Sequence, residues 1–115
     1  MEQAQIETIA RVCHAANKAW SEAGGDMSHT YWDMTKQALK DSAIRGVKFA
    51  IENPDVGPEV QHNAWMEDKI KNGWTYGATK NEIAKTHPSL KPYDQLPEAE
   101  RVKDKLFRAI VKALS

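Results

Sequence analysis

The sequence predicts a mainly α-helical domain of about four helices, with a small two-stranded β element between the third and fourth helices. Apolar residues recur every three or four positions over long stretches, which is the period of an amphipathic helix. Segment 62–96 differs, because it gathers two of the four tryptophans, two of the three tyrosines, two glycines and two prolines. That composition favours turns and short extended segments.

The length favours one domain over residues 1–115 with one hydrophobic core. We expect the short strands of the β element to pack on the edge of this core. The residues predicted to form the core lie on the apolar stripes of the helices and are Ile6, Ile9, Trp20, Leu39, Val47, Trp65, Leu106 and Ile110.

The first helix is expected over about residues 2–22, with Gly24 and Gly25 ending it. Its apolar stripe consists of Ile6, Ile9, Cys13, Ala16 and Trp20. Cys13 is followed by His14, but adjacent helical residues point about 100° apart, so they are poorly placed to act as nucleophile and base. Cys13 is therefore assigned to the core.

The loop over residues 26–34 carries Tyr31 and Trp32. We expect these rings to cover one end of the core, because exposed aromatic rings are costly. Loops also supply many binding residues, so Trp32 is kept as a candidate for a ligand site.

The second helix is expected to be capped by Asp33 or Thr35 and to end near Glu52, before Asn53-Pro54. Gly46 lies in its middle and costs about 1 kcal/mol relative to alanine. We therefore expect the backbone of another segment to approach Gly46 closely.

The third helix is expected over about residues 58–72, with Pro58 in its first turn and Gly73 in the left-handed position after its last turn. It should direct Trp65 and Ile70 toward the core.

The β element is predicted from the alternation of Trp74, Thr75 and Tyr76, which would place both rings on one face of a short strand. His87 precedes a proline and is therefore expected to be extended. Together with the segment that follows it through Leu90, Pro92 and Tyr93, His87 is predicted to form a second extended piece that pairs with the first strand. The last helix then opens at Pro97 with acidic residues in its first turn.

Two motifs resemble a known family. They are H-N-A-W-M-E-D-K-I-K-N-G-W-T-Y-G at 62–77 and H-P-S-L-K-P-Y-D-Q-L-P-E-A-E-R at 87–101. Together they resemble the ryanodine-receptor repeat, or RyR domain, with the strongest similarity over 62–105 and an extension upstream over 41–54. That module occurs in tandem in the calcium-release channels and as free-standing proteins of bacteria and bacteriophages. The resemblance implies a binding or assembly module.

Composition narrows the functional classes. Cys13 is the only cysteine, which excludes an internal disulfide and suits a reducing, cytoplasmic location. No apolar stretch reaches the length of about 20 residues that a membrane span needs, and the N-terminus lacks a signal pattern. The formal net charge is zero, so broad nucleic-acid binding is not expected. Residues 61–115 are nevertheless mildly basic, with ten Lys/Arg against seven Asp/Glu.

No catalytic motif is present, and the four histidines are scattered without metal-ligand spacing. The sequence is therefore interpreted as a non-enzymatic binding module without a cofactor. His87 is expected to hold its loop through a hydrogen bond rather than to ligate a metal.

The first functional hypothesis is an aromatic and basic pocket for a nucleotide or a nucleotide-derived signal. Its rings would be Trp74, Tyr76 and Tyr93, and its rim would carry Lys80, Lys91 and the protonated form of His87. The resemblance supports this hypothesis, since free-standing relatives are linked by context to nucleotide-signal systems. A phage copy would act by sequestering such a signal.

Three alternatives stay open. The module could assemble as a symmetric homodimer without a small ligand, imitating the tandem repeats of the channels. It could be an enzyme acting on a nucleotide derivative. The aromatic residues could also be no more than the core of a small domain.

Overall fold

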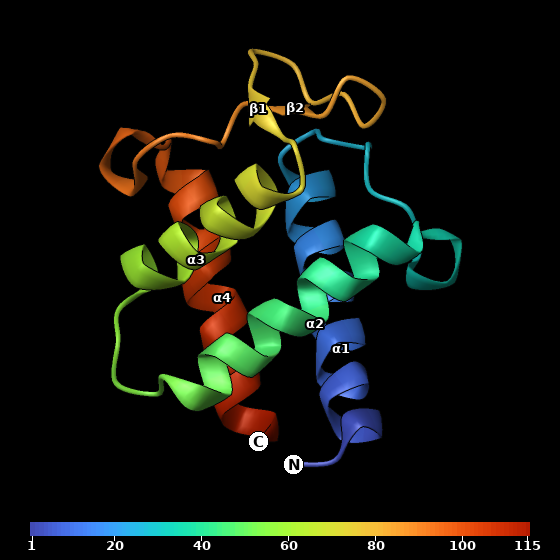
Figure 1. Cartoon of the computed structure of the whole chain (residues 1–115), viewed down its shortest axis with the longest axis vertical. Coiled ribbons are helices and arrows are strands. Elements are labelled where there is room, and N and C mark those ends of the chain that lie inside the picture. Colours follow the sequence, from blue (N-terminus) through green and yellow to red (C-terminus); the bar gives the residue numbers. More distant parts are fainter.

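The computed structural model describes residues 1–115, which form four α-helices and one two-stranded sheet (Figure 1). The helices and strands are α1 (Gln3–Ala23), α2 (Gln37–Glu52), α3 (Pro58–Lys71), β1 (Thr75–Tyr76), β2 (Thr86–His87) and α4 (Glu98–Leu114). This confirms the predicted fold class, including the position of the β element between the third and fourth helices.

The four helices enclose a common interior. α1 packs against α2 and α4, and α3 packs against the same two helices from the other side. Figure 1 shows α2 crossing in front of α1 and α4, with both chain termini together at one end and the β element at the other. The molecule therefore has a core end near the termini and a second end covered by the short strands.

The core end is built mainly from α1, α2 and α4. Its buried residues are Ile6, Ile9, Ala10, Cys13, Trp32, Val47, Ala50 and Val111, and Phe107 and Ile110 pack against them. Ile6, Ile9, Cys13 and Val47 are thus confirmed as core residues. Leu39, Trp65 and Leu106 are only half-buried, which corrects their assignment to the core.

Trp20 is also not a core residue, because it is 39 % exposed and its indole Nε1 donates a hydrogen bond to the Ala99 carbonyl at 2.9 Å. The inward line of α1 continues from Cys13 through Asn17 to the buried Ser21. Steps of four residues keep side chains on one helix face, whereas Trp20 is turned away from that face. The upper part of α1 therefore presents polar groups to the interior.

Two expected details of α2 and α3 are also corrected. Neither Asp33 nor Thr35 caps α2, since Lys36 occupies the N-cap and Thr35 Oγ1 donates instead to the Tyr31 carbonyl at 2.9 Å. Ile70 is 61 % exposed on α3.

Gly46 is tightly packed, as predicted. A Cβ atom on Gly46 would lie 3.3 Å from the Phe107 ring of α4. The neighbour is a side chain, however, rather than a backbone segment.

The sheet matches the prediction only in part, because His87 pairs with the first strand but the rest of the predicted segment does not. β1 pairs with β2 in parallel, with Thr75 opposite Thr86 and Tyr76 opposite His87. Between the two strands the chain reverses direction, and Asn81 and Thr86 form an antiparallel bridge. This turn allows β2 to run parallel to β1 after a short connection. The predicted pairing of the Leu90 to Tyr93 segment is wrong. Prolines at 88 and 92 have no backbone N–H to donate.

The two rings of the predicted strand do not share a face. Trp74 is buried, whereas Tyr76 is 57 % exposed. The reason is that Trp74 belongs to the end of α3 rather than to the strand. Gly73 has φ +87°, and the N–H groups of Gly73 and Trp74 donate to the carbonyls of Ile70 and Lys69 at 3.0 Å each. These are the two hydrogen bonds of a Schellman motif.

Candidate ligand-binding site

A cavity of about 540 Å³ lies between the four helices and the β element. This volume falls within the range typical of small-molecule sites. Part of its wall is apolar and adjoins the core, through Cys13, Phe49 and Phe107. The rest is polar and aromatic and is formed by α3, α4 and the segments around the sheet.

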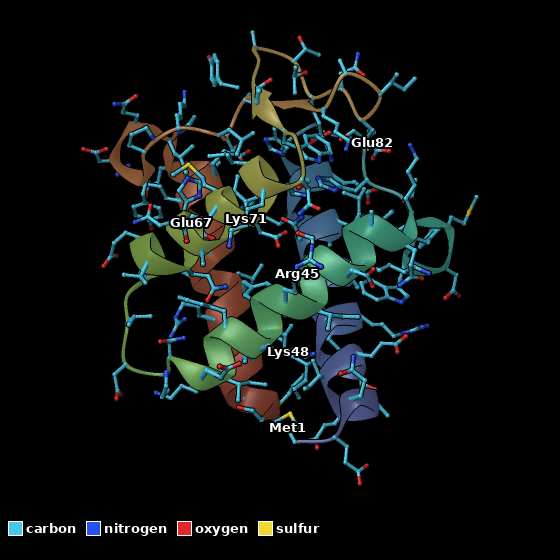
Figure 2. All side chains as sticks on the ribbon, viewed as in Figure 1. Met1, Arg45, Lys48, Glu67, Lys71 and Glu82 are labelled. Carbon is cyan, nitrogen blue, oxygen red and sulfur yellow. The ribbon has the colours of Figure 1, made fainter.

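The cavity reaches the surface between α2 and α3. Arg45, Glu67, Lys71 and Glu82 line it and are exposed. Figure 2 shows these four side chains on one face of the molecule, contributed by α2, by α3 and by the connection between β1 and β2.

Lys69 is the most deeply placed cation in this cavity. Its residue is only 8 % exposed, and its Nζ lies 4.9 Å from the centroid of the Trp74 ring. The Schellman motif creates this contact, because the third residue from the end of the helix meets the second residue after the cap. The Lys69 ammonium group makes no hydrogen bond and no ion pair within 4.0 Å, and burial lowers its pKa.

Asp68 is the neighbour of Lys69 in sequence, but its carboxylate has hydrogen-bond partners. Its carboxylate accepts a hydrogen bond from Arg45 Nε at 2.6 Å and another from Ser42. This carboxylate is therefore engaged by α2 and does not pair with Lys69.

Two further lysines approach the same region. Lys80, from the β1–β2 connection, is half-buried and makes no hydrogen bond or ion pair, and burial lowers its pKa. Lys103, from α4, is paired with Glu100 at 2.9 Å. Lys69 and Lys80 are thus the two cavity-lining ammonium groups that are at least half-buried and lack a partner.

His87 lies among these lysines as a neutral ring. The Ser89 N–H donates to His87 Nδ1 at 3.0 Å, so Nδ1 carries a lone pair and the remaining proton is on Nε2. Burial, followed by the charges of Lys80 and Lys69, lowers the pKa of His87 to about 3. The expected protonated His87 is therefore wrong at neutral pH. Its expected role in holding the loop through a hydrogen bond is confirmed.

Aromatic rings surround His87. The Trp65 ring meets it edge-on, with 5.0 Å between ring centroids, and the Trp74 ring is tilted against it at 6.4 Å. The cavity therefore combines ring faces with a neutral N–H donor and unpaired ammonium groups.

A buried histidine and aspartate form the wall on the α4 side. His62 Nε2 donates to the Lys91 carbonyl at 2.8 Å, so the Nδ1 atom that faces Asp104 at 3.7 Å is unprotonated in the neutral ring. Burial, followed by the charge of Glu100, raises the pKa of Asp104 to about 7. Asp104 is thus a titratable group close to neutral pH.

The four histidines line this one cavity, although they are scattered in the sequence. No group of three or more His, Cys, Asp or Glu side chains is placed to hold a metal ion.

The structure brings together three of the predicted site residues, Trp74, Lys80 and His87. Four others do not line the cavity. They are Trp32, which is buried in the core; Tyr76, which is exposed on β1; Lys91; and Tyr93, whose hydroxyl donates to the Arg101 carbonyl at 3.3 Å.

Sequence reasoning missed several lining residues, among them Lys69, Trp65, Lys103 and Asp104. A signal existed for Lys69, because the predicted cap at Gly73 already implies its contact with Trp74. Trp65, Lys103 and Asp104 reach the cavity from α3 and α4, and no local sequence pattern indicates that they line the same cavity.

Fold and site together define a small helical module with a polar, aromatic-walled cavity. The family model described as the RyR domain matches residues 55–115, which is more than half of the chain. The chain belongs to the RyR domain family. The match covers α3, the sheet and α4, whereas residues 41–54, which we expected to extend the resemblance, lie outside it. None of the helices is sufficiently long and apolar to cross a membrane.

Proposed function

We propose that this protein binds a nucleotide or a nucleotide-derived signal in the cavity, without transforming it. The observation that supports this proposal is the pair of unpartnered ammonium groups of Lys69 and Lys80 beside aromatic rings in one cavity of about 540 Å³. Buried cations normally have a partner, so an anionic ligand is the group that suits them.

Different groups in the cavity would contact different parts of a nucleotide. A planar base would stack on the Trp65 or Trp74 ring, since any base offers a flat face to an aromatic side chain. The neutral His87 would donate a hydrogen bond from Nε2, and the two lysines would meet phosphate. The resemblance to free-standing relatives linked with nucleotide signals points in the same direction. A protein that binds such a signal without altering it would keep it from its receptor, which suits a phage copy.

The test is a thermal-shift screen with mono-, di- and cyclic nucleotides. A ligand at 100 times its dissociation constant adds about 2.7 kcal/mol of stability, which corresponds to a rise of roughly 10 °C in Tm for a domain of this size. Lys80→Met should remove most of the rise, whereas Lys91→Met should retain it, because Lys91 does not line the cavity.

The proposal fails if no nucleotide raises Tm, or if Lys80→Met responds like the wild type. Chromatography of the nucleotide after long incubation separates binding from catalysis. Recovery of a changed nucleotide would replace the binding module with an enzyme.

A second candidate function is assembly as a homodimer. Three apolar or aromatic side chains on the connection between α1 and α2 are highly exposed, namely Met27 at 70 %, Tyr31 at 70 % and Met34 at 76 %. A surface of this kind suits a protein contact. Sedimentation at micromolar concentration should then show a dimer, and a particle of 13.0 kDa would exclude this candidate.

A further inference from the structure

The carboxylates near Lys69 and Lys80 are already paired with other groups. Asp68 is bound by Arg45 at 2.6 Å, Glu100 by Lys103 at 2.9 Å and Glu82 by Lys36 at 3.6 Å. The remaining one, Asp26, accepts a hydrogen bond from the Ser28 N–H at 2.9 Å and lies 3.6 Å from His29. Neither ammonium group therefore has a carboxylate within 4.0 Å, although the charges of Glu82 and Asp26 act on Lys80 from farther away.

The two ammonium groups come from different elements but lie near each other. Lys69 is on α3, and Lys80 is on the connection between β1 and β2. Lys69, Lys80 and His87 all line the same cavity, where the centroid of the Trp74 ring lies 4.9 Å from Lys69 Nζ and 6.4 Å from the centroid of the His87 ring. One small group in this cavity can therefore be placed between both lysines, with the His87 N–H beside it.

We propose that the ligand presents a phosphate group with two negative charges, such as a nucleoside monophosphate, bound between Lys69 and Lys80. This inference rests on the proposed function and specifies its ligand class. A phosphodiester or a cyclic monophosphate carries one negative charge and would leave one ammonium group unmatched in a partly buried site. A phosphate monoester has a second pKa near 6 and is a dianion at pH 7.5.

A bridging dianion would also restrain the β1–β2 connection. Two side-chain contacts link this connection to the helices: the exposed pair of Glu82 with Lys36 at 3.6 Å, and a hydrogen bond from Lys85 Nζ to the Asn72 carbonyl at 2.9 Å. A ligand held by both Lys69 and Lys80 adds a third link. Hydrogen exchange at the amides of residues 77–86 should therefore slow when the dianion binds.

Calorimetric titration at pH 7.5 should compare adenosine, 3′,5′-cyclic AMP and AMP, which share one base and differ in charge. A hydrogen bond to a charged group is worth about 1.5–3 kcal/mol, so AMP should bind roughly tenfold or more tightly than cyclic AMP. Lys69→Met and Lys80→Met each remove one charge and keep the aliphatic stem. Either change should lower the AMP preference to about threefold or less. Lys91→Met is the matched control and should keep the full preference.

Equal binding of AMP and cyclic AMP would overturn the two-charge inference while leaving nucleotide binding intact. The inference would also fall if both lysine variants kept the wild-type preference. A separate titration with sulfate and nitrate at equal ionic strength tests charge without a base. If no nucleotide binds but sulfate binds tightly and depends on both lysines, the inference holds and nucleotide recognition is wrong. If none of these anions binds, both proposals are wrong.

Discussion

Replacing Asp104 with asparagine should stabilise the protein by up to about 4 kcal/mol at pH 8 and by less than about 1 kcal/mol near pH 4. The carboxyl group is largely buried, with 17 % of the side chain exposed, and burial raises its pKa from 3.8 to about 7. Each unit of pKa difference corresponds to 1.36 kcal/mol, which leads to the value of about 4 kcal/mol.

The sign of this pH dependence follows from whether Asp104 holds its proton in the folded and in the unfolded state. Below the unfolded pKa of Asp104 both states hold the proton, and the burial has no ionic cost. As the pH rises toward 7, the unfolded chain loses this proton first, so the free energy of unfolding decreases. Above about pH 7 the folded state is ionised as well, and the full cost remains. An asparagine of nearly equal size has no proton to lose, so the cost disappears.

His87 has the opposite effect on stability as the pH changes. Its folded pKa is about 3 against an ordinary value of 6.5, so the unfolded chain takes up a proton first as the pH falls through this interval. That uptake destabilises the folded state at acid pH. The contributions of Asp104 and His87 should largely cancel between about pH 4 and pH 6.5 in the wild type. In Asp104→Asn the His87 contribution should become visible as a loss of stability on acidification.

Urea unfolding at pH 4, 6 and 8 measures these differences directly. Asp55→Asn is the control, because Asp55 is exposed and makes no hydrogen bond or ion pair, and it should change stability little at each pH. Equal stability of Asp104→Asn and the wild type at pH 8 would refute the reasoning. So would a loss of stability at pH 8, which would mean that the ionised carboxylate makes a favourable interaction.

Gly46→Ala should raise Tm slightly while weakening nucleotide binding, because alanine favours the helix by about 1 kcal/mol and the new methyl group displaces the Phe107 ring into the cavity. A clear fall in Tm would show that the ring cannot move. Cys13 should resist a thiol reagent at pH 8 in the folded protein and react in urea, because burial raises its pKa to about 12. Rapid reaction under native conditions would contradict its placement in the core.

Much of the helical fold could be predicted because its signals are local. Apolar spacing indicated the helices, and Gly73 indicated the end of α3 with its left-handed conformation. The same cap explains why Lys69 meets Trp74, so this half of the candidate site was contained in a stretch of six residues.

Predictions that depended on long-range packing were wrong more often. Trp20 matches the helical period as well as Ser21 does, but the small Ser21 side chain faces the interior. The strand pairing was predicted only in part. His87 pairs with β1, but the Leu90 to Tyr93 segment does not, because a two-residue parallel pair depends on a preceding turn that the pattern of apolar residues does not indicate.

The sequence by itself determined the four helices, the β element between the last two, the closely packed Gly46 and the resemblance to the RyR domain family, because these depend on local spacing and on motifs. Only the tertiary structure decided which charged groups share a site. Lys80 lies in the cavity and Lys91 does not. His87 is neutral because burial and the charges of Lys80 and Lys69 lower its pKa, and the Ser89 N–H places its proton on Nε2. The physical reason is that burial and partners across the fold set the charge of each group, and residues far apart in the chain supply both.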